Sequence, residues 1–371
     1  MRYIETDKDL AATIRTLESE SSLAVDTEAA GYHRYADTIC VVQLSTHDLT
    51  FVVDALAVDI HALAPVFEDP EREILLHDAD YDLRLLSRDH GIGVSKLFDT
   101  KLAAQLLGEP SIGLASLVEK HVGVKLDKKY QRADWAQRPL PAELIEYAAD
   151  DTRYLPSLRD RLHDALAATG RLRWAQEEFA LRAEAEFDIR PDGTGYLRLK
   201  NTRDLNPRQM ATLRELYDWR DRLAQERDTA PFRVLSNEQL VSIARRQPRS
   251  IEELRSGDTN AATLRHARDL FEAVQRARAL PDAELPSRSR GTGRPSPDPE
   301  FEARVDLLKT VRDTAATELG MDRGFLMPRQ QLEDIARAEP RSVAELEAVP
   351  GIRRWQVEAL GEALLAALRS A

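Results

Sequence analysis

Four acidic residues and one tyrosine are the candidates for chemistry in this sequence: Asp26, Glu28, Asp82, Tyr147 and Asp151. Hydrolysis of a phosphodiester places an attacking hydroxide in line with a leaving alkoxide, and two divalent ions about 3.5–4 Å apart can stabilise both oxygens. Mg²⁺ and Mn²⁺ prefer carboxylate oxygens, and four acids offset the charge of two such ions. A tyrosine hydroxyl close by can orient the attacking water. No other catalytic set is visible, because the eight histidines lack zinc-like spacing and no phosphate loop or serine elbow occurs.

The first pair of acids follows an expected strand. Residues 22–25 form a short apolar run that leads directly into Asp26 and Glu28. Two acids separated by one residue on an extended chain point to the same side, so both can face one metal ion. The same spacing also begins at three aspartates that lie next to prolines, where a solvated loop acid is the simpler interpretation: Asp69, Asp282 and Asp298.

The other candidates lie on expected helices, and their spacing is less specific. Asp82 falls in the first turns of a helix after an apolar strand. We favour it over Asp78 and Asp80, which could simply stabilise the positive end of the helix dipole. Tyr147 and Asp151 are four positions apart, so they share one face of a helix. On spacing alone, however, a core tyrosine beside a surface acid is the more usual arrangement.

The distribution of charge is more informative than its total. The 371 residues have a net charge of −12, and residues 1–160 account for all of it, with 17 basic and 29 acidic residues. Residues 190–260 carry 14 basic and 11 acidic residues, which permits contacts to phosphates. No apolar run approaches the roughly 18 residues that cross a bilayer, no apolar signal segment opens the chain, and a single cysteine, Cys40, cannot form an internal disulfide. We therefore expect a cytoplasmic protein that does not bind membranes.

Strand and helix signals alternate in the first hundred residues and predict an α/β domain with a mixed sheet. The apolar stretches predict four strands, the middle two forming a hairpin, at 22–25, 40–44, 50–53 and 74–77. Amphipathic periodicity predicts helices at about 80–90, 99–107, 113–121 and 141–168. From about residue 170 onward the pattern is helical, without a convincing strand.

The helical part of the sequence repeats at an offset of 92 residues without a gap. Pro248-Arg249-Ser250 matches Pro340-Arg341-Ser342, and flanking apolar and arginine positions match as well. Between the copies, residues 281–299 have the proline, glycine and serine content of a linker. We therefore predict two copies of one small helical module, one on each side of that linker.

The candidate residues resemble the motifs of the DEDD exonuclease superfamily, in the branch with a tyrosine in its third motif. Asp26-x-Glu28, Asp82 and Tyr147-x-x-x-Asp151 occur in the order of that family. The resemblance implies an RNase H-like fold, two divalent metal ions (Mg²⁺ or Mn²⁺) and hydrolysis from the 3′ end to nucleoside 5′-monophosphates. It further implies that the four acids are metal ligands and that Tyr147 positions the nucleophilic water.

Other stretches narrow the resemblance to the ribonuclease D family and extend it over nearly the whole chain. Residues 41–44, 98–101 and 126–140 are similar to segments around the family's motifs, and the repeated module resembles the HRDC domain. The implied organisation is an exonuclease domain at 1–186, a first HRDC-like domain at 200–280, a linker at 281–299 and a second HRDC-like domain at 300–371.

The sequence departs from the family pattern at a position whose side chain can contact the terminal base of the substrate. Ala29-Ala30-Gly31 follows Glu28 where many relatives carry a bulky aromatic residue. That aromatic can pack on the terminal base, so its absence puts base stacking in question and leaves the metal chemistry untouched. Tyr32 and Tyr35 are candidate substitutes.

Basic residues before the third motif are the candidate substrate contacts. Lys128, Lys129 and Arg132 stand out in an otherwise acidic domain, and we interpret them as a phosphate clamp, with a solvated loop as the alternative. Trp135 could stack on a base, but a structural role is favoured. Arginines of the first helical module could also bind backbone phosphates: Arg214, Arg220, Arg222, Arg227, Arg233, Arg245, Arg246 and Arg249.

These observations lead to a 3′→5′ exoribonuclease, and the resemblance favours tRNA precursors as substrates in tRNA 3′ maturation. We expect a monomer. A DNA exonuclease with the same metal site is the first alternative. A nucleic-acid-binding scaffold with an inactive nuclease domain is the second, although all four acids and the tyrosine are present.

Overall fold

The computed structural model describes residues 1–185, 193–257, 261–286 and 298–370. Its contacts divide the chain into two compact units. The first unit comprises 1–28, 39–187 and 295–371, and the second comprises 29–38 and 188–294. Most of the predicted linker, residues 287–297, lies outside the described residues.

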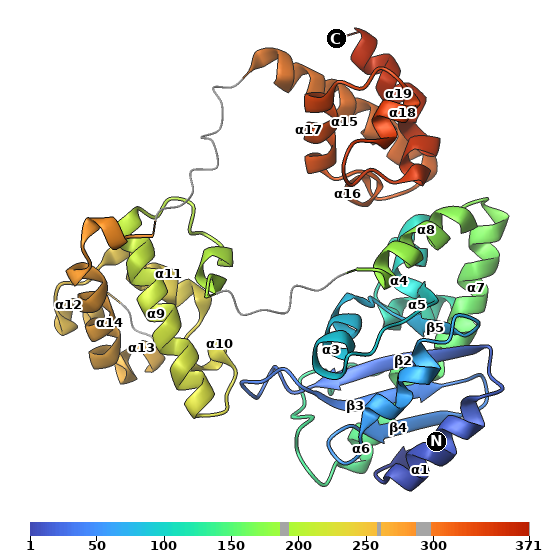
Figure 1. Cartoon of the computed structure of the whole chain (residues 1–371), viewed down its shortest axis with the longest axis horizontal. Helices are drawn as coiled ribbons and strands as arrows, with labels where there is room; N and C mark the ends of the chain where they lie inside the picture. Colours follow the sequence, from blue (N-terminus) through green and yellow to red (C-terminus); the bar gives the residue numbers. More distant parts are fainter. Residues whose placement is uncertain (186–192, 258–260, 287–297, 371) are drawn as a thin grey trace. The chain divides into compact units, whose positions relative to one another are not determined.

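A six-stranded sheet forms the centre of the first unit (Figure 1), with the strand order β1-β4-β3-β2-β5-β6. The strands are β1 (Arg2–Ile4), β2 (Ser22–Ala29), β3 (Ile39–Ser45), β4 (Thr50–Asp54), β5 (Glu73–Leu76) and β6 (Leu97–Asp99). β3 pairs with β4 antiparallel, whereas β1 with β4, β2 with β5, and β5 with β6 pair parallel. The predicted mixed sheet and its hairpin are therefore confirmed.

Two features of this sheet differ from the prediction. β1 and β6 were missed because three residues are too short for a period-2 pattern to be recognised. β2 continues to Ala29, so Asp26 and Glu28 lie within the strand rather than after it. The side chains of both acids therefore follow the regular alternation of side chains along a strand.

Helices pack around the sheet of the first unit (Figure 1). They are α1 (Asp7–Leu17), η1 (Ile60–Leu63), α2 (Ala64–Phe67), α3 (Asp80–His90), α4 (Thr100–Leu107), α5 (Leu114–Val122), α6 (Ala142–Arg153), α7 (Leu155–Ala168) and α8 (Leu172–Ala183). The prediction of a single helix at 141–168 is wrong, because the chain breaks at Tyr154 between α6 and α7. Pro156 explains the break: proline lacks an amide hydrogen and clashes within a helix, but it fits the first turn of a new one.

Two helical modules follow, as predicted. The first contains η2 (Gly195–Arg198), α9 (Pro207–Glu226), α10 (Pro231–Val234), α11 (Asn237–Arg246), α12 (Ile251–Ser256), α13 (Ala261–Arg265), α14 (Ala267–Ala279) and η3 (Asp282–Glu284). The second contains α15 (Pro299–Leu319), α16 (Arg323–Leu326), α17 (Arg329–Ala338), α18 (Val343–Glu347) and α19 (Arg354–Ser370).

The sequence repeat corresponds to a repeat of structure. α11 and α17 begin 92 residues apart and end 92 residues apart. Ser250 and Ser342 each cap the next helix, accepting a hydrogen bond from a backbone N–H three residues on. Arg220 is buried in the first copy, and Arg312 is buried at the matching position of the second.

The second module packs on α8 within the first unit. Trp174 and Trp355 stack with their ring centroids 5.4 Å apart. Glu177 accepts hydrogen bonds from the backbone N–H groups of Arg354 (2.8 Å) and Trp355 (3.0 Å). Its carboxylate thus occupies the positive end of α19, where the first backbone donors have no partner within the helix.

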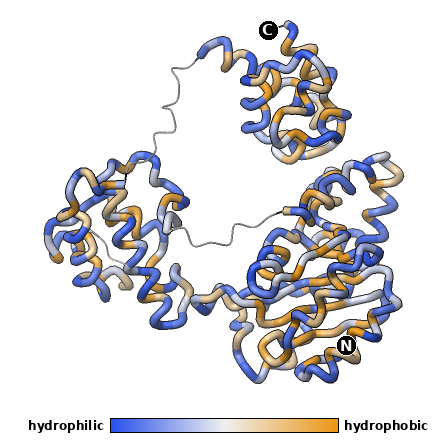
Figure 2. The backbone as a smooth tube through the Cα atoms, viewed as in Figure 1, coloured by the Kyte–Doolittle hydropathy of each residue, from blue (hydrophilic) through white to orange (hydrophobic). Residues whose placement is uncertain are grey.

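Hydrophobic residues are frequent along the strands of the sheet (Figure 2), and each long helix also buries several apolar residues. Every residue of β3 and β4 is buried, which is typical of strands covered on both faces. Within the described residues, no helix is long and apolar enough to span a bilayer.

Candidate active site

The middle of the sheet carries the first two acids. Asp26 and Glu28 follow the fully buried run Leu23–Val25 on β2. Strand alternation directs their side chains to the same face, as predicted. Asp26, Glu28 and Asp151 each contribute a carboxylate oxygen to a group in which all three oxygens lie within 4.8 Å of one another. Asp151 thus meets two acids that precede it by more than 120 positions in the sequence.

α6 brings Asp151 to the sheet. Ala148 and Ala149 on this helix are fully buried, and their small side chains permit a close approach to β3. Ser45 of β3 and Thr152 of α6 place their hydroxyl oxygens 2.8 Å apart. These contacts hold the helix in a fixed register, so Asp151 faces the acids of β2.

Asp82 lies next to this cluster, in the first turn of α3. It is not one of the three grouped acids, but its charge is close enough to raise the pKa of both Asp26 and Glu28. Its Oδ1 accepts a hydrogen bond of 2.5 Å from Oγ1 of Thr27. The structure therefore brings all four predicted acids into one neighbourhood.

The two aspartates that compete with Asp82 have other partners. Asp78 forms an ion pair with Lys101, and Asp80 forms one with Arg182. Both pairs are partly exposed, whereas Asp82 is 5% exposed. The geometry thus favours Asp82 as the member of the acidic site.

Burial and mutual repulsion determine the charge of these acids in the metal-free protein. Burial, followed by the charge of Asp82, raises the pKa of Asp26 well above its usual range. Burial, followed by the charge of Asp151, does the same for Glu28. Burial also raises the pKa of Asp82 to about 6 and that of Asp151 to about 7.

Such a cluster can be fully charged at neutral pH only if cations neutralise it. Its donors are all carboxylate oxygens, the ligand type that Mg²⁺ and Mn²⁺ prefer. The residues present therefore fit divalent metal ions and could bind them.

Tyr147 lies one helical turn before Asp151. Burial, followed by the charges of Asp151, Glu28 and Asp26, raises the pKa of its phenol above the usual value. The hydroxyl therefore keeps its proton at neutral pH and can donate a hydrogen bond. This property suits a group that orients a water molecule.

The loop before α6 packs on Tyr147. The ring centroid of Tyr147 lies 5.7 Å from that of Tyr130 and 6.1 Å from that of Trp135. Trp135 is only 2% exposed, so its indole forms part of the core and cannot stack on a base. The structural role favoured for this tryptophan is therefore the one that the geometry supports.

The basic residues of the same loop are exposed. The side chains of Lys128, Lys129 and Arg132 reach solvent, and the ammonium group of Lys129 lies 4.8 Å from the ring centroid of Tyr130. Tyr130 links the two features, because it directly follows Lys129 of the predicted phosphate clamp and its ring packs on Tyr147 of the site.

An ion pair that was not predicted attaches this loop to the sheet. Arg138 donates to both carboxylate oxygens of Asp54 at 2.6 Å, and it donates to the carbonyl of Trp135 at 2.7 Å. Tyr3 donates to the same carboxylate. The only signal available in the sequence was Arg138 in the stretch at 126–140, and nothing local identified Asp54 as its partner.

The two tyrosines considered as substitutes for the missing aromatic belong to the second unit. The hydroxyl of Tyr35 donates to Asp221 at 3.0 Å, and the ring packs against the core of the first helical module. The ring of Tyr32 packs on Phe232, with the guanidinium of Arg233 above it. Both rings therefore have a structural role within this unit.

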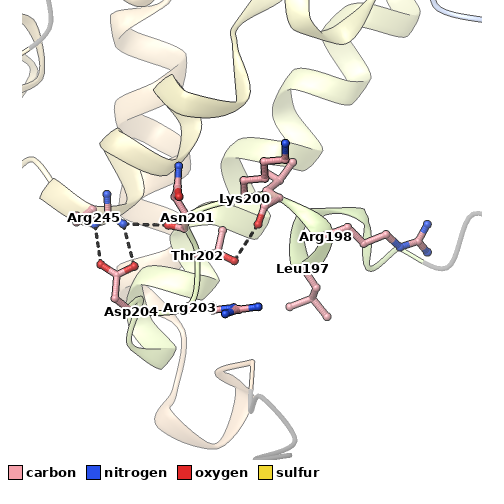
Figure 3. Close-up of a pocket in the computed structure, with 9 residues that line it drawn as sticks. Leu197, Arg198, Lys200, Asn201, Thr202, Arg203, Asp204 and Arg245 are labelled. Carbon is pink, nitrogen blue, oxygen red and sulfur yellow. Dashed lines mark hydrogen bonds and ion pairs between the residues drawn. The ribbon is translucent and has the colours of Figure 1, made fainter. Parts of the chain in front are cut away.

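The first helical module contains a separate cavity of about 840 Å³ (Figure 3). Residues 197–204 line it together with Arg245. Arg245 is held there by Asp204 and by the carbonyl of Asn201, both at 2.9 Å. The side chain of Lys200 is exposed beside it.

One arginine assigned to phosphate binding has a different role. Arg220 is 4% exposed and donates to the carbonyl of Leu235 (2.9 Å) and to Asn237 (2.8 Å). Its interpretation as a phosphate contact is therefore wrong, because it serves the core of the module.

Family models match both parts of the chain. The model described as 3′-5′ exonuclease matches residues 1–167. The model described as HRDC domain matches 209–274 and 301–368.

Individual relatives match over nearly the full length. Ribonuclease D of Escherichia coli strain K12 is 30% identical over 98% of this chain and 97% of its own. Ribonuclease D of Gluconacetobacter diazotrophicus is 31% identical over 98% of this chain and 91% of its own. The crystal structure of Escherichia coli RNase D, described as an exoribonuclease involved in structured RNA processing, matches with a TM-score of 0.72 at 28% identity, covering 99% and 98% of the two chains.

Proposed function

This chain belongs to the ribonuclease D family of 3′-5′ exoribonucleases, and from that premise we propose how its residues carry out the reaction. Asp26, Glu28, Asp82 and Asp151 would bind two divalent cations, Mg²⁺ or Mn²⁺. The observation that supports this most directly is the group of carboxylate oxygens from three of these acids within 4.8 Å. Bound cations would supply a hydroxide nucleophile at neutral pH and stabilise the leaving oxygen.

The protein's own groups would orient the attack. Tyr147, protonated and one turn from Asp151, would donate a hydrogen bond to the attacking water and hold it in line with the terminal phosphodiester. The packing of Tyr130 and Trp135 on its ring supports this role, because a ring fixed on two sides presents its hydroxyl in one direction.

The exposed basic loop would hold the 3′ end of the RNA. Lys128, Lys129 and Arg132 would contact backbone phosphates, which carry no sequence information and allow successive nucleotides to be removed. Exposed basic residues of the first helical module, such as Lys200, would add further contacts to backbone phosphates (Figure 3).

The physiological substrate would be a structured RNA with a protruding 3′ end, with tRNA precursors in the cytoplasm as our first candidate. The structural relative from Escherichia coli is described as acting in structured RNA processing, which supports this class. We propose that the protein acts as a monomer, since each chain contributes all four acids and the tyrosine.

A labelled digestion tests the activity and the site together. RNA labelled at the 5′ end should give a ladder that shortens one nucleotide at a time, and RNA labelled at the 3′ end should release labelled mononucleotide at once. Chelation of divalent ions should stop both reactions. Asp26→Asn should lose most of the activity at unchanged folding, because a predicted metal ligand loses its charge.

Two results would favour the alternatives. Faster digestion of a matched DNA oligonucleotide would indicate a DNA exonuclease. RNA binding without any shortening in Mg²⁺ or Mn²⁺ would indicate a scaffold with an inactive nuclease domain.

A further inference from the structure

Thr27 has no part in the chemistry described so far, yet it contacts one of the acids of the site. It stands between Asp26 and Glu28 on β2, so its side chain points to the opposite face of the strand from theirs. Its Oγ1 donates to Oδ1 of Asp82 at 2.5 Å, in a buried hydrogen bond between residues 55 positions apart. Thr27 is 7% exposed and Asp82 is 5% exposed, so water competes little for this bond.

The sheet leaves room for this contact because β5 ends early. β2 pairs with β5 only through Ser22–Ala24, whereas β2 itself continues to Ala29. Thr27 therefore lies beyond the last residue of β2 that pairs with β5. It is close to the point where the chain leaves β5 and enters α3. A side chain at this position can reach the first turn of α3.

The start of α3 depends on partners outside the helix. Its N-cap residue, Ala79, has no side chain that can cap the helix. The buried carboxylate of Asp99, at the end of β6, instead accepts hydrogen bonds from the backbone N–H groups of Asp78 (3.1 Å) and Ala79 (2.9 Å). Asp99 thus holds the backbone before Asp82, and Thr27 holds the carboxylate itself.

We propose that Thr27 is a positioning residue that fixes the carboxylate of Asp82, so that Oδ1 is held by the hydroxyl and Oδ2 faces a divalent cation. The inference rests on the proposed metal-dependent function. A carboxylate that is already oriented does not have to be ordered when the cation binds. Outer partners of this kind typically contribute about 10–100-fold to metal affinity or activity.

Two substitutions at Thr27 separate the hydroxyl from the shape of the side chain. Thr27→Val keeps the branched shape without the hydroxyl, and Thr27→Ser keeps the hydroxyl without the methyl group. In the full-length protein, we expect Thr27→Val to weaken Mn²⁺ binding by about 10–100-fold in titration calorimetry and to lower kcat on an RNA oligonucleotide similarly. The KM for RNA should stay within about twofold. Thr27→Ser should restore both quantities to within about threefold of wild type.

Thr212→Val is the matched control. Thr212 lies on α9 in the first helical module, and the change removes a fully buried hydroxyl that donates to the carbonyl of Arg208 at 3.0 Å. It should leave Mn²⁺ binding unchanged. Thermal melting in chelator reports folding separately, and Thr27→Ala provides a smaller side chain if valine lowers the melting temperature strongly.

Failure of this inference and failure of the proposed function would give different results. Wild-type Mn²⁺ affinity in a folded Thr27→Val or Thr27→Ala variant would overturn the inference, and so would an equal loss in Thr212→Val. If wild-type protein binds no Mn²⁺ under the same conditions, the proposed metal-dependent function itself fails. Loss in Thr27→Val with recovery in Thr27→Ser would establish the positioning role.

Discussion

Replacement of Asp151 by asparagine should stabilise the metal-free protein while it removes most of the nuclease activity. Burial raises the pKa of Asp151 from 3.8 to about 7, with a further contribution from the charge of Asp150. At about pH 8 the metal-free protein must therefore carry this charge in an environment that disfavours it. Asparagine has nearly the same shape and no charge, so it relieves that cost.

The size of the effect follows from the shift in pKa. A shift of about three pKa units at 1.36 kcal/mol per unit corresponds to roughly 4 kcal/mol. Part of the Asp151 side chain still reaches solvent, which screens the charge, so we expect a gain of about 2–3 kcal/mol in the free energy of unfolding. That is a large fraction of the typical stability of a domain.

The gain in stability from Asp151→Asn should depend on pH. A carboxyl group whose pKa rises on folding favours the folded state below its unfolded pKa of 3.8, and this contribution is lost as the pH rises through about 7. The advantage of asparagine should therefore be greatest at about pH 8 and fall to less than half by about pH 5. Urea unfolding in chelator at both pH values measures it.

An exposed aspartate on the next helix provides the control. The side chain of Asp164 on α7 is 83% exposed, so water already stabilises its charge in the folded protein. Asp164→Asn should therefore give no comparable gain in stability. The reasoning is refuted if metal-free Asp151→Asn is no more stable than wild type at about pH 8, if Asp164→Asn gains equally, or if the gain is the same at both pH values.

Two further predictions concern catalysis and substrate binding. Tyr147→Phe keeps the ring packing but removes the hydroxyl, so single-turnover rates should fall by about 10²–10³-fold. Mn²⁺ binding and the melting temperature should stay unchanged. A wild-type rate would exclude a role for the hydroxyl. Joint substitution of Lys128 and Lys129 by alanine should raise the KM for RNA and make it less dependent on salt, because fewer phosphates are neutralised. Lys96→Ala, an exposed lysine outside this loop, should change neither quantity.

Local periodicity accounts for what could be read correctly from the sequence. The same-side arrangement of Asp26 and Glu28 requires only that the chain be extended, and the shared face of Tyr147 and Asp151 requires only a helix. The repeated modules were also recognisable, because the same local pattern occurs twice at the offset of 92 residues. These features depend on neighbours within a few positions of one another.

The errors have local causes as well. β1 and β6 are too short for a period to be seen, and the periodicity on both sides of Tyr154 concealed the break between α6 and α7. Pro156 was a signal that could have located that break. Arg220 was misassigned because a charged residue on a helix gives no local indication that it is buried.

Sequence patterns, together with the family resemblance, thus identified the residues that we propose as cation ligands and the kind of element on which each lies. Only the tertiary structure decided that Asp151 meets the acids of β2, that Thr27 holds Asp82, and that burial raises the pKa of these groups. The reason is physical. Contacts between residues 55 or more positions apart arise from the order of strands in the sheet and the packing of helices on it, and no local pattern specifies either.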